Sequence, residues 1–161
     1  MNSVVTDQVS GRAFVSEALF GRLVDRIVVK ELVERPMAER IMDQALAYLK
    51  ACADNPGAAL SPSPSVDIGW HTFLLYTQEY AEFCQGVGGF FIHHVPDDEV
   101  APRGPRGRAL TQSVDAIRAA GIVVDTDLWP TADVADASCS NSGCGAGPPP
   151  SDVAVRELCR L

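Results

Sequence analysis

Asp67 and His71 lie four residues apart in SVDIGWHTFLLYTQEY, residues 65–80, and their types and spacing could do chemistry. A helix places residues i and i+4 on one face, so a carboxylate and an imidazole would face each other. One interpretation is an ordinary ion pair on a solvent-facing stripe. The other is a metal site, in which Asp67 binds the metal or orients His71 through its second ring nitrogen.

The other two histidines of the chain, His93 and His94, follow shortly afterwards in FFIHHVP. Because they come soon after the helix that carries His71, we expect them to approach it. Imidazole is the commonest metal-ligating side chain. All three histidines of the chain could therefore converge on one site. A set of four ligands would take His71 and one of His93 and His94.

Cys139 and Cys144 stand in CSNSGC, with four residues between them. This spacing lies at the edge of what zinc sites use. A set of His71, one of His93 and His94, and both cysteines would suit zinc, with Asp67 beside a ligand and not bound to the ion. A set richer in oxygen and nitrogen donors would suit iron or manganese.

The elements that must position these residues are predicted to be helical. Apolar spacing predicts a helix over 14–34, a second from Pro36 to the DNPG stop, a central one over about 65–85, and a fourth ending at Gly121. The prediction is an all-α fold, a compact bundle of about four helices over residues 1–131. Residues 132–161 are expected to form a long, irregular Gly/Pro-rich tail, which bound cysteines would dock on the core.

The predicted central helix is apolar around most of its circumference. Taken as one helix, it gathers its polar residues in a narrow stripe: Asp67, His71, Gln78, Glu82 and Gln85. Such a helix is expected to be buried on nearly all sides. Ser63 and Ser65 are the candidate residues for its N-terminal cap.

Composition limits the function classes. The 161 residues include 13 basic and 21 acidic ones, a net charge of −8, and basic residues form no long run. Nucleic acid is therefore not an expected partner. The sequence has no 18-residue apolar window and no secretory leader pattern, and its five cysteines are an odd number, so a cytoplasmic protein without a membrane partner or disulfide framework is expected.

Residues 66–96 resemble the glycine-rich domain-containing protein-like family, in its short bacterial form. The resemblance is carried by Asp67, Trp70, His71, Leu75, Tyr80, Cys84 and Gly89. Some longer relatives have a second histidine where this chain has Phe73. The resemblance implies a helical domain in which Asp67, Trp70 and His71 matter, and it names no reaction.

Three functions follow as hypotheses. The first is a small metal-binding protein, with zinc expected and iron as the alternative. The second is a metal-free interaction module whose acidic surface and tail dock on another protein. The third is a metal-dependent enzyme, in which an open metal position or the Asp67–His71 pair acts as a general base.

Overall fold

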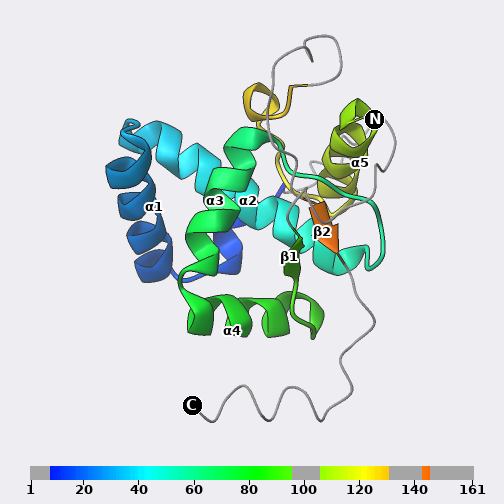
Figure 1. The fold of residues 1–161 in the computed structure, drawn as a ribbon, viewed down its shortest axis with the longest axis horizontal. Coiled ribbons are helices and arrows are strands. Elements are labelled where there is room, and N and C mark those ends of the chain that lie inside the picture. Colours follow the sequence, from blue (N-terminus) through cyan, green and yellow to red (C-terminus); the bar gives the residue numbers. More distant parts are fainter. Residues whose placement is uncertain (1–7, 96–105, 131–142, 146–161) are drawn as a thin grey trace, which may run out of the picture.

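A computed structural model of the chain describes residues 8–95, 106–130 and 143–145. This part of the chain is mostly helical (Figure 1), which confirms the predicted all-α class. The predicted tail lies outside the described residues apart from one short strand. In chain order the elements are η1 (Gly11–Phe14), α1 (Glu17–Glu31), α2 (Arg35–Asp54), α3 (Pro64–Leu74), α4 (Thr77–Gly88), β1 (His93–Val95), α5 (Arg106–Ala119), η3 (Thr126–Leu128) and β2 (Gly143–Gly145).

Helix starts follow the signals in the sequence. The Ser16 hydroxyl caps α1 by accepting the N–H of Leu19 at 3.2 Å. Pro36 stands in the first turn of α2, where its missing N–H leaves no hydrogen bond unmade. The Ser63 hydroxyl caps α3 by accepting the N–H of Val66 at 3.2 Å. The two serine caps fix where α1 and α3 begin.

Helix α2 is the centre of the fold. It contacts η1, α1, α3, α4 and α5, and from Gln44 to Ala53 every residue except Lys50 is buried. The sequence pattern had favoured residues 65–85 for this place. Instead, small residues of α2 such as Ala45 and Ala47 let the neighbouring helices approach from several sides.

The predicted central helix is two helices in the structure. Helix α3 ends at Leu74 and α4 begins at Thr77, with Tyr76 at φ −96° and ψ 65°, outside the helical region. Helix α4 then runs in a different direction from α3 (Figure 1). The turn brings Tyr80 and Phe83 back against Phe73, with ring centroids 5.2 and 5.3 Å apart.

The break also divides the predicted polar stripe. Asp67 and His71 lie on α3, whereas Gln78, Glu82 and Gln85 lie on α4. The single axis assumed for the stripe does not exist, so only the first two residues keep their predicted relation.

Gly69 sets the close approach of α3 to α2. A Cβ atom at this position would lie 2.6 Å from the Cβ of Ala45 and 3.1 Å from the carbonyl oxygen of Ile41. Real Cβ atoms do not approach a neighbouring helix so closely. Glycine is therefore required for the helix that carries Asp67 and His71 to lie where it does.

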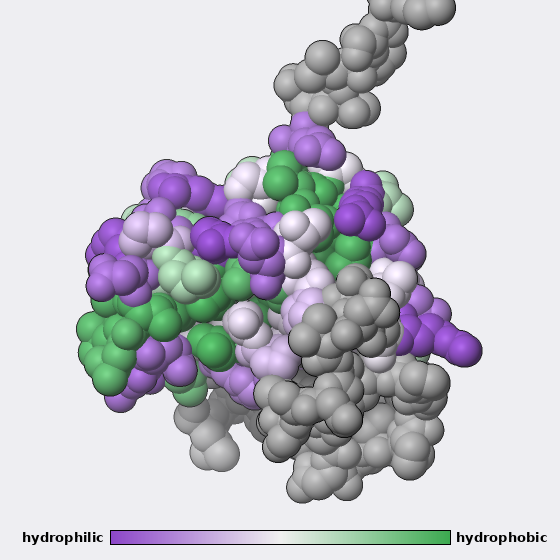
Figure 2. All heavy atoms as spheres, turned by 90° about the horizontal axis from the view of Figure 1, so that it is seen from above, coloured by the Kyte–Doolittle hydropathy of each residue, from purple (hydrophilic) through white to green (hydrophobic). Residues whose placement is uncertain are grey.

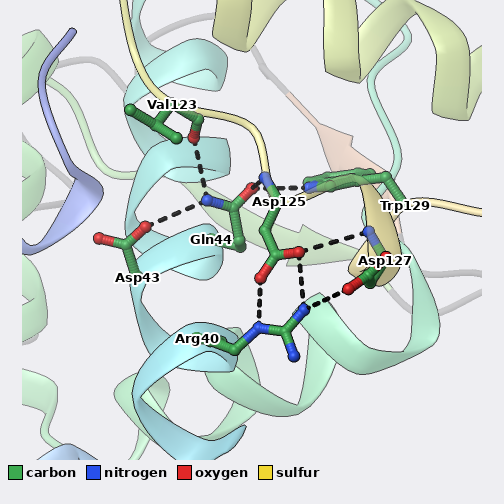
Figure 3. Close-up of polar contacts among 7 residues, drawn as sticks. All are labelled: Arg40, Asp43, Gln44, Val123, Asp125, Asp127 and Trp129. Carbon is green, nitrogen blue, oxygen red and sulfur yellow. Dashed lines mark hydrogen bonds and ion pairs between the residues drawn. The ribbon is translucent and has the colours of Figure 1, made fainter. Parts of the chain in front are cut away.

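A buried amide holds the segment after α5 on α2 (Figure 3). The Gln44 side chain is 1% exposed. Its Oε1 accepts the N–H of Asp125 at 3.1 Å and the indole N–H of Trp129 at 2.9 Å. Its Nε2 donates to the carbonyl oxygen of Val123 at 3.0 Å and to Asp43 Oδ2 at 3.1 Å. Every donor and acceptor of the amide is satisfied, as burial requires.

Arg40 reinforces this contact from the preceding turn of α2. Its Nη2 donates to Asp125 Oδ1 and Asp127 Oδ2, both at 2.8 Å (Figure 3). The hydrogen bond from Arg40 lowers the pKa of Asp125 below its ordinary value. The ionised carboxylate is therefore the form that the fold favours.

The surface mixes apolar and hydrophilic side chains. On the face drawn in Figure 2, green areas are bordered by purple ones, and the largest green area lies on the side of α1. Val29 and Leu32, near the end of α1, are 69% and 89% exposed. Among the described residues, no helix combines the length and the apolar character needed to cross a membrane.

Replacing Gly69 by Ala is expected to lower the free energy of unfolding by about 1–3 kcal/mol, because the added methyl group overpacks the contact between α3 and α2. Urea denaturation measures this loss. Gly86→Ala is the matched control, since a Cβ at this exposed position of α4 meets nothing within 4 Å. It should be neutral or stabilising by up to about 1 kcal/mol. Equal stability of the two variants would contradict the proposed role of Gly69.

Replacing Asp125 by Asn is expected to lower the melting temperature at pH 7 and to matter progressively less below about pH 4. A lowered folded-state pKa contributes stability above the unfolded pKa, and this contribution is lost as the pH falls through the folded value. Thermal melts between pH 2 and pH 7 test the pattern. Asp115→Asn is the control, because it removes a charge that is 67% exposed on α5, and it should change the melting temperature little.

Candidate metal centre

Asp67 is the centre of a small polar cluster between α3 and β1. Its Oδ2 lies 3.2 Å from His71 Nδ1, one helical turn along α3. Its Oδ1 lies 3.2 Å from His94 Nε2, which belongs to β1. One carboxylate therefore bridges two imidazoles from different elements. The capped start of α3 fixes Asp67, whose backbone N–H donates to the carbonyl of Ser63 at 2.9 Å.

The three side chains are close enough to hold one metal ion. One potential ligand atom from each, a carboxylate oxygen and two ring nitrogens, lies within 4.8 Å of both others. The side chains of Asp67 and His94 are 14% and 11% exposed, whereas that of His71 is 54% exposed. The cluster thus has a sheltered wall and a side that faces solvent.

Aromatic packing holds the His94 ring in place. Its centroid lies 4.4 Å from that of Trp70 and 4.4 Å from that of His71. The Trp70 ring is fully buried, and it contacts Tyr48 of α2 at 5.5 Å. The imidazole from β1 therefore rests on the core and is not held by the short strand alone.

A buried chain of hydrogen bonds ties the residue before β1 to α3 and α4. The indole N–H of Trp70 donates to the Tyr80 hydroxyl at 2.9 Å, and that hydroxyl donates to the carbonyl of Ile92 at 2.6 Å. Ile92 is two residues before His94. Burial raises the pKa of Tyr80 well above its ordinary value, so the phenol stays protonated and keeps donating.

Cys84 lies next to the same chain and is buried. Burial is the main cause that raises the pKa of its thiol, and hydrogen bonds from the Ile92 backbone and from Tyr80 oppose this shift. A neutral thiol in such a place packs and is not poised to attack a substrate. Cys52 of α2 is buried as well.

The other predicted ligands are placed differently. His93 is exposed, and its ring lies 4.9 Å from that of Phe91, outside the cluster. Cys139 lies outside the described residues. The backbone of Cys144 is in β2, which pairs with β1 in antiparallel register and sets Cys144 opposite His94.

The sequence left the choice between His93 and His94 open, and the structure brings His94 to Asp67. It also places an Asp67 oxygen among the three potential ligand atoms, whereas the predicted zinc set had Asp67 beside a ligand and not bound to the ion. Tyr80 is the supporting residue that spacing alone did not assign. A phenol on the apolar side of a helix was the available signal, because a buried hydroxyl needs a partner.

Replacing Tyr80 by Phe should lower the free energy of unfolding by about 2 kcal/mol or more, because the Trp70 N–H and the Ile92 carbonyl both lose their partner. Denaturant unfolding measures the loss, and the ring-proton NMR signals of His94 should shift with it. Tyr76→Phe is the control, since that exposed hydroxyl has only a 3.5 Å contact with the Arg22 carbonyl. Unchanged stability and unchanged His94 signals would refute the role of Tyr80.

Comparison with known proteins gives one match. The model of the UCP032817-like family matches residues 12–114, which include Asp67, His71 and His94. No curated protein and no solved structure matches the chain. The expected membership of the glycine-rich domain-containing protein-like family is wrong, since the matching model is of another family and nothing indicates a glycine-rich domain. The match covers more than half of the sequence, and the chain belongs to the UCP032817-like family.

Proposed function

We propose that this protein binds one divalent transition-metal ion, with zinc as the expected metal, through Asp67, His71 and His94. The observation that carries the proposal is the convergence of three potential ligand atoms within 4.8 Å of one another. They come from two elements that are far apart in the sequence. Iron is the alternative that elemental analysis would reveal.

The donor set suits such an ion. Imidazole nitrogens bind zinc, iron, copper and nickel, and a carboxylate oxygen completes a mixed nitrogen and oxygen set. His71 would bind through Nδ1 and His94 through Nε2, the two atoms that now face Asp67. The net charge of −8 favours the approach of a cation.

An ion pair without metal is the competing explanation. A pair at i and i+4 is common on helices and contributes only a few tenths of a kcal/mol. It accounts for Asp67 with His71, but it does not account for the His94 ring, which reaches the same carboxylate from β1. Convergence of a third group in a sheltered place favours a ligand site.

Three protein donors leave room in the coordination sphere. A tetrahedral zinc ion with three protein ligands has one position for water, a substrate or a further side chain. The exposed side of His71 lies where such a group could enter. Zinc-activated water would make a hydrolytic enzyme the second candidate function.

The test is elemental analysis by mass spectrometry of full-length protein purified without an affinity metal. About one equivalent of zinc is expected, and His94→Ala should lose it, as should His71→Ala. His93→Ala is the matched control, because it removes an imidazole one residue away that lies outside the cluster. Circular dichroism confirms that each variant keeps its helices.

Two results would overturn the proposal. One is wild-type protein that contains no metal and binds none when zinc is added in a calorimeter. The other is equal metal content in His93→Ala and His94→Ala, which would place the ion elsewhere.

A further inference from the structure

The strand β2 consists of only Gly143, Cys144 and Gly145, and it pairs antiparallel with β1. The register sets Gly143 opposite Val95, Cys144 opposite His94, and Gly145 opposite His93. Cys144 is the one residue of this strand that bears a side chain beyond a hydrogen atom. It is paired with His94, the histidine of β1 that belongs to the candidate metal centre.

Register also decides which face of the ladder each residue occupies. Residues directly opposite each other in an antiparallel pair lie on the same face, and successive residues alternate between faces. Cys144 and His94 therefore share one face, and the two glycines share the other with His93 and Val95. A slip of one residue would put a glycine opposite His94.

We propose that Cys144 supplies the fourth donor to the metal ion held by Asp67, His71 and His94, an inference that depends on the proposed metal site. A thiolate with three nitrogen and oxygen donors completes the tetrahedral sphere that zinc prefers. As the sulfur–metal bond forms, the thiol proton passes to solvent. The metal then joins β2 to α3 and β1.

The other cysteines of the described residues do not compete for this role. Cys52 and Cys84 are buried in the core, and the Cys84 thiol is engaged with Tyr80 and the Ile92 backbone. Cys139 and Cys159 lie outside the described residues. They serve as controls because each variant removes one thiol from the same C-terminal stretch.

A filled fourth position changes the expected role of the ion. Zinc sites with four protein ligands are typically structural, whereas catalytic sites keep an open position. The site would then fasten the C-terminal part of the chain to the helical core. The same role is expected from the sequence for cysteines bound to the metal.

Cobalt(II) titration of the full-length, metal-free protein provides the test. Cobalt replaces zinc in tetrahedral sites, and a bound thiolate adds a sulfur-to-cobalt charge-transfer band in the near ultraviolet. Wild type, Cys139→Ala and Cys159→Ala should show this band, whereas Cys144→Ala should lose it. The zinc affinity of Cys144→Ala should fall at least about 10-fold. Loss of a residue that only supports a ligand already costs that much, and loss of a ligand should cost no less.

The outcomes separate this inference from the proposed metal site. Cobalt binding that His94→Ala abolishes, without a charge-transfer band in wild type, would retain the site and overturn the role of Cys144. A band that survives in Cys144→Ala and disappears in Cys139→Ala would overturn it as well. No cobalt binding at all would overturn the metal site itself and the ligand assignment with it.

Discussion

The packing of α2 against every other α-helix of the described chain is the constraint on which the structure depends. A helix buried on nearly all sides needs small residues where its neighbours cross it, and Ala45 meets Gly69 at such a crossing. This contact sets the distance of α3 from the core. The positions of Asp67 and His71 follow from it, because both lie on α3.

The second half of the candidate centre depends on a different kind of interaction. β1 is three residues long, and a strand so short has little stability of its own. The Tyr80 hydroxyl fixes the chain just before it by bonding to both Trp70 and the Ile92 carbonyl. The hydrogen bonds of this buried phenol thus position His94, whereas helix packing positions Asp67.

Sequence patterns predicted the all-α class, Ser63 as one of two candidate caps, and the pairing of Asp67 with His71, because these depend on local spacing. They did not predict the break between α3 and α4. Residues 74–77 contain no glycine or proline, and an apolar pattern around most of the circumference fits one buried helix or two short ones. The choice of His94 over His93 could not be read from sequence either, since it depends on which face of β1 meets α3.

The family prediction failed because it relied on about 30 residues, whereas the matching model spans residues 12–114.

The aromatic contacts of Tyr48 have an optical consequence. The chain contains two tryptophans, and both are buried against this tyrosine, Trp70 at 5.5 Å and Trp129 at 6.1 Å. Trp70 also lies against His94, and Trp129 belongs to the segment that Gln44 holds. Indole emission depends on polarity and on neighbouring imidazole, which quenches it when protonated. The intrinsic fluorescence of the protein therefore reports on both places at once, with no added label.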